Sequence, residues 1–237
     1  MIKIIFFDID GTLIDLHTKQ MSSATKDALL RLQSAGIKIC VATGRTPANL
    51  PVLAGIPFDV WLTMNGSYCF DASGPIFCNP LPGEAVEGIL ENAKKQGISL
   101  TAAVENSGMF TRIPAEEIEG GTVYQLMCQC PEEACRAVLE GVSGAKMASW
   151  WSKAVDIMPA DGGKGRAIRE ILAYFGLERS EAMAFGDGNN DMPMLQVVGT
   201  GVAMGNASDN LKAMADDVCG DVSQDGIYHY CLEHGLI

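Results

Sequence analysis

Short apolar runs alternate with amphipathic stretches along much of the chain. Residues 3–7 (KIIFF) combine β-branched and aromatic side chains, which predicts a buried strand. Ser22 and Ser23 then offer an N-cap for a stretch with apolar residues at helical spacing, and Gly36 suits the position just past a helix end. Residues 37–42 (IKICVA) predict a second buried strand. This order predicts two parallel strands joined by a right-handed helical crossover.

Further strands and a helix follow from the same pattern. Residues 59–64 (DVWLTM) and 182–185 (AMAF) predict strands, and residues 198–204 (VGTGVAM) predict the last strand of the core. Residues 166–175 (RAIREILAYF) place their apolar side chains on one face of a helix that ends at Gly176. We therefore expect an α/β fold with a Rossmann-like parallel sheet core.

Two breaks rich in proline and glycine, residues 79–83 (NPLPG) and 158–163 (MPADGG), divide the chain. The segment between them has shorter, alternating apolar runs and predicts two helices and five strands. The helices are expected at residues 84–95 and 132–140, and the strands near residues 98–104, 108–113, 123–129, 145–151 and 154–158. We expect a core domain of residues 1–82 and 159–237 and an inserted α+β cap domain of residues 83–158.

Composition narrows the classes of function. The chain has 237 residues and a net charge of −12, which argues against a nucleic-acid partner but leaves a small anionic substrate possible. No run reaches the ~18 apolar residues of a membrane span, and no segment resembles a signal sequence. We therefore expect a cytoplasmic protein that does not enter a membrane. The sequence does not indicate an oligomeric state.

The cysteine pattern does not predict a metal site. Cys128, Cys130 and Cys135 are close in sequence, but there is no C-x-x-C pair and no matching pair of histidines. We expect the eight cysteines to be mostly buried thiols.

Residues that carry chemistry follow the ends of the predicted core strands. Because the carboxyl ends of parallel strands meet at one edge of a sheet, we expect these residues to converge on one crevice. In strand order they are Asp8 and Asp10, then Thr43-Gly44-Arg45, then Asn65-Gly66, and finally Gly186-Asp187-Gly188-Asn189-Asn190-Asp191.

Asp8 and Asp10 lie two residues apart, so an extended strand would point both in the same direction. Such carboxylates repel each other unless a cation is near. With Asp187 they make an oxygen-rich site without histidine or cysteine, which suits Mg²⁺. Gly11 lets the chain turn at once. Taken alone, Asp10-Gly11 is also typical of an ordinary hairpin turn.

Lys164, in the tract Gly162-Gly163-Lys164-Gly165, stands at the start of a predicted helix. A cation there opposes the helix dipole, and an anion bound at the helix N-terminus would compensate it. A solvated loop lysine is the alternative. Thr43 could donate its hydroxyl to a phosphate oxygen or cap a turn, and Asn65-Gly66 could be a turn. The tract is not a P-loop, and Gly199-x-Gly201 lacks the third glycine of a dinucleotide fingerprint.

Other polar and aromatic residues point less clearly to function. His17, His229 and His234 are scattered, and surface or packing roles are favoured for them. Trp150, Trp151 and Lys153 in the insert could touch a substrate, but strand packing is favoured.

The ordered motifs resemble those of the haloacid dehalogenase superfamily. The insert is similar to the type IIB cap of its Cof-type sugar-phosphatase branch, although it looks short for that branch and could lack a strand or helix. Asn65-Gly66 and the D-x-x-N-D form of the last motif also match the branch. The resemblance covers essentially the whole chain. Its motifs are specific for the superfamily and much less so for a substrate.

The resemblance implies a phosphatase of small phosphorylated metabolites, a sugar phosphate first among them. Asp8 would be the nucleophile that forms an aspartyl-phosphate, and Asp10 the general acid and later base. Mg²⁺ would bind the Asp8 and Asp187 carboxylates and the Asp10 carbonyl. The remaining roles are implied in the same way: Thr43, Gly44, Lys164 and Asn190 hold phosphate, Asp191 orients Lys164 or a metal-bound water, and Gly11, Arg45 and Asn65 support the loops.

Two alternatives stay open, and a third is disfavoured. A phosphomutase of similar fold would transfer the phosphoryl group to a second hydroxyl. A non-catalytic phosphometabolite-binding protein would not need a nucleophile beside an acid. A dehalogenase is disfavoured because halide departure needs no protonation by Asp10. In the phosphatase reading, the cap closes over the site through the two proline- and glycine-rich breaks.

Overall fold

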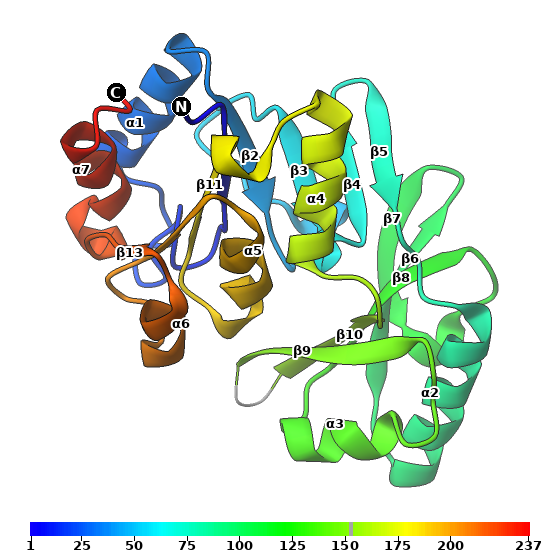
Figure 1. The fold of residues 1–237 in the computed structure, drawn as a ribbon. Coiled ribbons are helices and arrows are strands. Elements are labelled where there is room, and N and C mark those ends of the chain that lie inside the picture. The colour runs from blue at the N-terminus through cyan, green and yellow to red at the C-terminus, as the bar shows by residue number, and fades with distance from the viewer. Residues whose placement is uncertain (152–153) are drawn as a thin grey trace.

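The computed structural model of the protein describes residues 1–151 and 154–237, and the side chains of residues 149–151 also lie outside the description. Trp150, Trp151 and Lys153 therefore lie outside the side chains described. Two sheets form two lobes, with both chain termini in the larger lobe (Figure 1).

The larger sheet has eight strands in the order β13-β12-β11-β1-β2-β3-β4-β5. Its central strand β1 pairs in parallel with both β2 and β11, as expected from the sequence. The strands are β1 (Ile4–Phe7), β2 (Lys38–Ala42), β3 (Val60–Thr63), β4 (Tyr68–Asp71), β5 (Gly74–Cys78), β11 (Ala182–Gly186), β12 (Thr200–Ala203) and β13 (Asp217–Val218).

Two parts of this sheet differ from the expectation. The hairpin of β4 and β5 pairs antiparallel to β3 and was not predicted. The expected last strand is β12, but β13 follows it and pairs with it in parallel. Strand β13 is only two residues long and exposed, so its apolar pattern is too short to detect.

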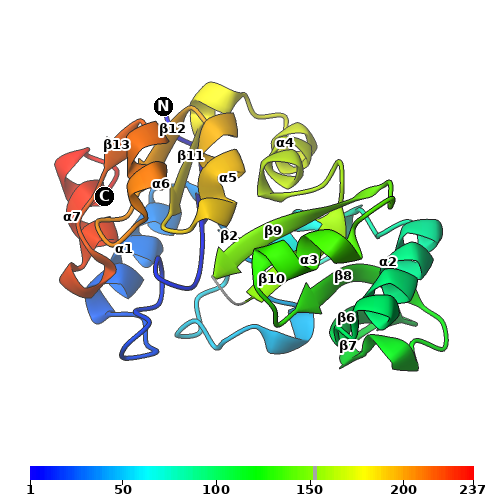
Figure 2. The same ribbon diagram turned by 90° about the horizontal axis from the view of Figure 1, so that it is seen from below.

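Helices cover both faces of this sheet (Figure 2). Helix α1 contacts α7, and α4 contacts α5. Ser22 caps α1, because its side chain accepts a hydrogen bond from the Thr25 amide, as expected. The helices are α1 (Ser23–Ser34), α4 (Lys164–Phe175), α5 (Met192–Val197), α6 (Asp209–Met214) and α7 (Gly226–Glu233), of which the last three were not predicted.

Burial of the central strands explains their apolar pattern. All four residues of β1 are buried, and Phe7 stacks on Phe185 of β11 with ring centroids 5.3 Å apart. A strand covered on both faces has no polar alternation, so a continuous apolar run is what the position requires. This rigid centre fixes the place where Asp8 and Asp10 leave the sheet.

The smaller sheet has five strands in the order β7-β6-β8-β10-β9, and all neighbours are antiparallel. The five expected strands and both expected helices are present. They are α2 (Gly83–Gln96), β6 (Leu100–Asn106), β7 (Met109–Pro114), β8 (Thr122–Cys128), α3 (Glu132–Val138), β9 (Ala145–Trp151) and β10 (Ala154–Pro159).

The smaller sheet contacts the larger lobe near a short 3₁₀ helix, η2 (Met64–Gly66). Met64 lies in one apolar cluster with Ala103 of β6 and Tyr124 of β8. Helices α2 and α3 contact each other over a separate apolar core of the smaller lobe, to which Ile89, Leu126 and Val138 belong. The smaller sheet therefore has an apolar core on its own side and meets the larger lobe with side chains from β6 and β8.

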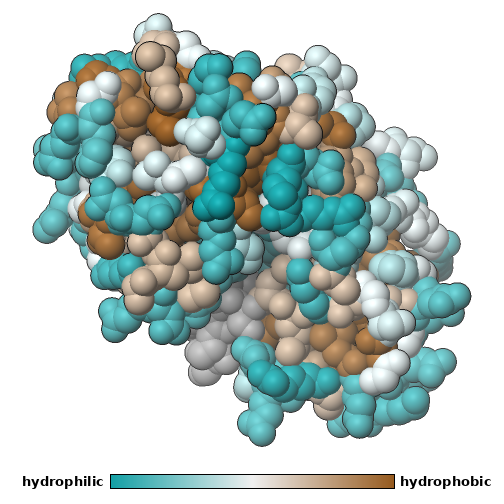
Figure 3. Space-filling view, in the orientation of Figure 1, coloured by the Kyte–Doolittle hydropathy of each residue, from teal (hydrophilic) through white to brown (hydrophobic). Residues whose placement is uncertain are grey.

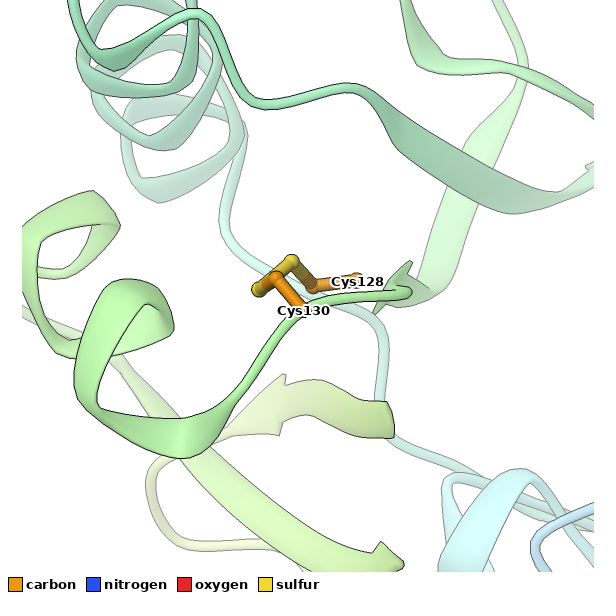
Figure 4. Close-up of a disulfide and its surroundings, with 2 residues drawn as sticks. All are labelled: Cys128 and Cys130. Carbon is orange, nitrogen blue, oxygen red and sulfur yellow. A yellow bond between two sulfur atoms is a disulfide. The ribbon is translucent and has the colours of Figure 1, made fainter. Parts of the chain in front are cut away.

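Two cysteines differ from the expectation of thiols. Cys128, at the end of β8, and Cys130 form a disulfide (Figure 4). The other six cysteines are free, and all of them except Cys78 are buried.

Hydrophilic side chains are spread over both lobes of the face shown in Figure 3. In the described part of the chain, every helix is too short or too polar to cross a membrane.

Candidate active site

A cavity of about 930 Å³ is lined by the strand ends of the larger lobe and by strands of the smaller one. It brings together residues that are up to 182 positions apart in sequence, from Asp8 to Asn190. The predicted site residues that line it are Asp8, Asp10, Thr43, Gly44, Arg45, Asp187 and Asn190. Lys164, Asp191 and Asn65 are buried and are connected to these residues by hydrogen bonds.

Lys164 joins two of the predicted carboxylates. Its Nζ lies 2.6 Å from Asp8 Oδ1 and 2.6 Å from Asp191 Oδ1, and its side chain is fully buried. The lysine is the first residue of α4, and the N-cap Gly163 has a φ of 114°. The alternative of a solvated loop lysine is therefore wrong.

Burial shifts the pKa values of Asp8, Asp187 and Lys164. Desolvation raises the pKa of Asp8 to about 7, even though Lys164 opposes the shift. Desolvation, followed by repulsion from Asp8 and Asp191, raises the pKa of Asp187 to about 8. Desolvation lowers the pKa of Lys164, but the carboxylates of Asp191 and Asp8 outweigh it and raise that pKa above its ordinary value. The acids thus have more negative charge than one lysine compensates.

The loop after β11 holds Asp187 in place. Asp191 Oδ2 accepts hydrogen bonds from the amides of Asp187 and Gly188, each 3.0 Å long. Thr12 Oγ1 donates to Asp187 Oδ1 at 3.0 Å. A Cβ on Gly11, whose φ is 90°, would lie 2.2 Å from Asp187 Oδ2. Glycine is therefore required there for the Asp8 and Asp187 loops to approach each other.

The carboxylates fit a divalent cation. Ligand oxygens of Asp8, Asp187 and Asp191 all lie within 4.8 Å of one another. Both oxygens of Asp191 already accept hydrogen bonds, from Lys164 and from two amides. Among the described residues, only Oδ1 of each of Asp8 and Asp187 is hydrogen-bonded, which leaves the second oxygen of each available to a cation. An all-oxygen donor set of this kind suits a hard cation.

Arg45 contacts the second predicted catalytic acid. Its Nε and Nη2 donate to Asp10 Oδ2 and Oδ1, and both distances are 2.7 Å. The hydrogen bond to Asp10 is the main reason that the pKa of Arg45 is raised. Arg45 Nη1 also donates to the Asn49 carbonyl at 3.2 Å, which ties the loop after β2 together. The sequence indicated only this loop-supporting role, and the pairing with Asp10 was missed.

Thr43 and two amides can hold a phosphate. Thr43 is buried, and its Oγ1 accepts from the Arg45 amide at 3.1 Å, which leaves the hydroxyl hydrogen free to donate. Among the described residues, the amides of Asp10 and Gly44 have no backbone acceptor. These donors lie beside Asp8 at the edge of the sheet, where backbone N–H groups can bind an anion.

Asn65 connects the two lobes, a role that the sequence did not reveal. Its Nδ2 donates to Asp156 Oδ2 of β10 at 2.9 Å and to Gln125 Oε1 of β8 at 3.3 Å. Asn190 Nδ2 donates to Asn65 Oδ1 at 3.4 Å, and Gln125 Nε2 donates to the Gly44 carbonyl at 3.3 Å. A network of amides and one carboxylate thus runs from the smaller sheet to the predicted phosphate-binding residues.

Asp156 and Gln125 are functional candidates that sequence reasoning missed. Both are buried, at 3% and 1% exposure, and both line the cavity. A signal was present, because Asp156 is the one polar residue of its strand (AVDIMP) and Gln125 lies within a mostly apolar strand (TVYQLMC). A buried polar residue in such a run needs a partner, which here comes from the other lobe.

The histidines keep the packing and surface roles that the sequence favoured. In the described part of the chain, His17, His229 and His234 do not line the cavity. His234 stacks on Tyr230 at 3.9 Å between ring centroids, and His229 contacts Tyr228.

Comparison with known proteins agrees with this geometry. The family profile of the haloacid dehalogenase-like hydrolases matches residues 5–126 and 113–231. The YkrA protein of Bacillus subtilis (strain 168) is 31% identical over 99% of this chain and 98% of its own. The HMP-PP phosphatase of Yersinia pestis is 28% identical over 100% of this chain and 96% of its own.

A solved structure extends the likeness to three dimensions. The subclass IIB sugar phosphatase BT4131 of the same superfamily superimposes with a TM-score of 0.91. It is 32% identical, and the alignment covers 99% of this chain and 100% of that chain. The chain therefore belongs to the haloacid dehalogenase-like hydrolases, as a phosphatase of the Cof-type branch.

Proposed function

We propose that the protein is a Mg²⁺-dependent phosphatase that hydrolyses a small phosphorylated metabolite, with a sugar phosphate as its substrate, through an aspartyl-phosphate. The observation that carries the proposal is the buried Lys164, which lies 2.6 Å from Asp191 and 2.6 Å from Asp8, a residue that lines the cavity. A lysine buried between acids, beside free amides, suits the binding of a doubly charged phosphate next to a carboxylate nucleophile.

In the first step, an Asp8 carboxylate oxygen attacks the phosphorus. The new oxygen–phosphorus bond forms as the bond to the leaving alcohol breaks, and protonated Asp10 gives its proton to the departing oxygen. Lys164, Thr43 and the Gly44 amide stabilise the negative charge on the phosphoryl oxygens in the transition state. The products of this step are the free alcohol and the aspartyl-phosphate.

In the second step, Asp10, now a carboxylate, takes a proton from a water molecule that attacks the phosphorus. The bond between Asp8 and phosphorus breaks, and the Asp8 carboxylate is regenerated together with inorganic phosphate. Asp10 thereby recovers the proton that it gave away, so the cycle is balanced.

Asp8, Asp187 and the Asp10 carbonyl would hold Mg²⁺. When bound, the ion neutralises the negative charge that otherwise keeps a phosphate away from a carboxylate. Asp191 supports the site indirectly, because its two oxygens orient Lys164 and the Asp187 amide.

The pairing of Asp10 with Arg45 adds a step to the proposed cycle. Both carboxylate oxygens of Asp10 are occupied by hydrogen bonds from the Arg45 guanidinium. To act as an acid, Asp10 must therefore leave Arg45 and take up a proton when the substrate arrives. We infer that substrate binding and closure of the cap drive this exchange.

Residues 83–158 would act as the cap, with the two linkers as hinges. The linkers lie together, because Asn79 Nδ2 donates to Asp161 Oδ1 at 3.1 Å. The sheet of the cap brings Gln125, Gln129 and Asp156 to the cavity. These polar groups can bind hydroxyl groups, which supports a sugar as the leaving group. The structurally similar BT4131 is a sugar phosphatase, which also supports a sugar phosphate as the substrate.

Replacement of Asp8 by Asn tests the chemistry. We expect phosphate release from p-nitrophenyl phosphate and from a panel of sugar phosphates to fall by about 10³-fold or more, because the nucleophile is lost. Asp27→Asn, an exposed acid on α1, is the matched control and should retain activity. Wild-type turnover in Asp8→Asn would contradict the proposal. Recovery of an isomerised sugar phosphate in place of inorganic phosphate would indicate a mutase instead.

A further inference from the structure

We propose that Arg112 of the cap and Lys19 of the core bind a second anionic group of the substrate, remote from the phosphate that is cleaved. The proposed ligand is a metabolite that carries a phosphomonoester and, at its other end, a further phosphate or a carboxylate. The inference rests on the proposed phosphatase function and names its substrate class.

The cations of the cavity divide into two kinds. Arg45 lines the cavity and is neutralised by Asp10, and Lys164, buried behind the lining residue Asp8, is neutralised by Asp8 and Asp191. Arg112 and Lys19 also line the cavity, yet neither forms an ion pair or a side-chain hydrogen bond with any residue that the structure describes. The catalytic scheme uses neither of them.

The two free cations come from different lobes. Arg112 belongs to β7, which contacts the 3₁₀ helix η1 (Pro47–Asn49) of the core. Lys19 belongs to the loop between β1 and α1, which also places Leu16 on the cavity wall. A ligand between them would be held by the cap and the core together.

Arg112 and Lys19 are cations in a strongly acidic protein, which favours a role for them in binding an anion. The chain carries a net charge of −12, so its overall field repels anions and an anionic group needs specific cations to bind. The acid facing Lys19 is Asp15, whose oxygen already accepts the amides of His17 and Thr18. Neighbouring Lys19 helps to lower the pKa of Asp15, after those two hydrogen bonds. Arg112 has no such acidic neighbour among the described ion pairs.

A buried hydroxyl supports a polar ligand at this end of the cavity. Thr46 lines the cavity, is 4% exposed, and its Oγ1 has no hydrogen-bond partner among the described residues. A buried hydroxyl without a partner is costly unless a ligand supplies one.

Size is consistent with a ligand that spans the cavity. A volume of about 930 Å³ is far more than a phosphoryl group needs, and pockets of ~300–1,000 Å³ hold whole metabolites. The leaving group therefore has room to reach from Asp8 to the free cations.

Paired substrates that differ only in the second anion test the inference. We would measure kcat/KM with Mg²⁺ for fructose 1,6-bisphosphate against fructose 6-phosphate, and for 6-phosphogluconate against glucitol 6-phosphate, which has an alcohol in place of the carboxylate. The first pair tests a phosphate and the second a carboxylate. We expect the doubly anionic member of at least one pair to be preferred by about 10-fold or more, as for a charge-assisted hydrogen bond.

Two variants locate the preference. Arg112→Gln and Lys19→Gln should each reduce the ratio of kcat/KM within the preferred pair by about 10-fold, mostly through KM. Arg169→Gln and Lys26→Gln, exposed cations that do not line this cavity, are the matched controls and should keep the ratio. No preference in either pair, or a preference that survives in both cavity variants, would overturn the inference.

Binding to an inactive enzyme separates this inference from the phosphatase proposal. Asp8→Asn titrated calorimetrically with the same compounds reports the subsite without turnover. Tighter binding of the doubly anionic compounds, lost in Asp8→Asn/Arg112→Gln, would support the subsite even if the wild-type protein released no phosphate. Equal binding of both members of each pair would overturn it, even if phosphatase activity were present.

Discussion

Asp10 is the residue whose environment says most about how the site is controlled. It lies two positions after Asp8 but has a different partner: Arg45 holds both of its oxygens at 2.7 Å, whereas Asp8 is held by Lys164. Two neighbouring carboxylates are thus given separate cations. In the proposed cycle, this separation would let Asp8 attack phosphorus while Asp10 exchanges protons with the leaving group and with water.

Removal of Arg45 should affect substrates according to whether their leaving group needs a proton from Asp10. In Arg45→Ala, Asp10 loses the resting partner that holds it beside the site between turnovers, so we expect kcat for sugar phosphates to fall by about 10- to 100-fold. p-Nitrophenyl phosphate has a leaving group that departs without protonation, so its hydrolysis should fall much less. Arg45→Lys should recover only part of the loss, because an ammonium cannot make the paired contact. An equal loss on both substrates would contradict a role through Asp10.

At the scale of elements, the contact between η2 and the strands β8 and β10 joins the cap to the core. Asn65 has φ 55° and ψ 29°, a left-handed conformation that aims its amide at Asp156 and Gln125. The side-chain oxygen of Asn65, Oδ1, at the same time accepts a hydrogen bond from Asn190 Nδ2. The element therefore links the closing surface of the cap to a residue that we propose to bind phosphate.

Two substitutions at Asn65 separate the amide from the backbone. Asn65→Gly keeps the left-handed conformation but removes a donor to the buried Asp156, and should lower the free energy of unfolding by roughly 1–3 kcal/mol. Asn65→Ala should lose about 1 kcal/mol more, because a Cβ disfavours this conformation. Denaturant unfolding measures both values. Equal stability of the two variants would show that the backbone conformation does not matter.

At the scale of the whole molecule, the acids at the edge of the sheet link stability to pH and to metal. The folded protein raises the pKa of Asp8 to about 7 and that of Asp187 to about 8, from an ordinary value of 3.8. Between the ordinary pKa of 3.8 and these raised values, the folded chain binds more protons than the unfolded chain. The stability that these acids contribute is therefore complete below about pH 4 and is lost as the pH rises through 7 and 8.

Without divalent metal, the melting temperature should therefore fall between about pH 5 and pH 8. Added Mg²⁺ needs the deprotonated acids, so it should raise the melting temperature more at pH 8 than at pH 6. Asp187→Asn removes one of the two acids and should weaken both effects. Differential scanning calorimetry with and without EDTA measures them. A metal-free protein that becomes more stable over this range would contradict the assignment.

The sequence was sufficient where a local pattern reflects burial. The strands β1, β2, β3 and β11 were predicted because a continuous apolar run records burial on both faces of a sheet. The strands and helices of the cap were predicted because two-residue and helical periodicities record which face is covered. The hairpin of β4 and β5 was missed because most of its residues are only partly buried, so its pattern is weak. The short helices α5 and α6 offer too few turns for a periodicity to be recognised.

By itself, the sequence determined that Asp8, Thr43 and Asp187 stand at strand ends, because parallel strands share one carboxyl edge. It also determined that Lys164 begins a helix. Only the tertiary structure decided that Arg45 pairs with Asp10, that Asn65 meets Asp156, and that Arg112 and Lys19 line the cavity without an ion pair to any described residue. These outcomes depend on how loops from distant segments and a second lobe come together. Such contacts leave no periodic trace in the chain, since each involves a single side chain whose partner lies far away in sequence.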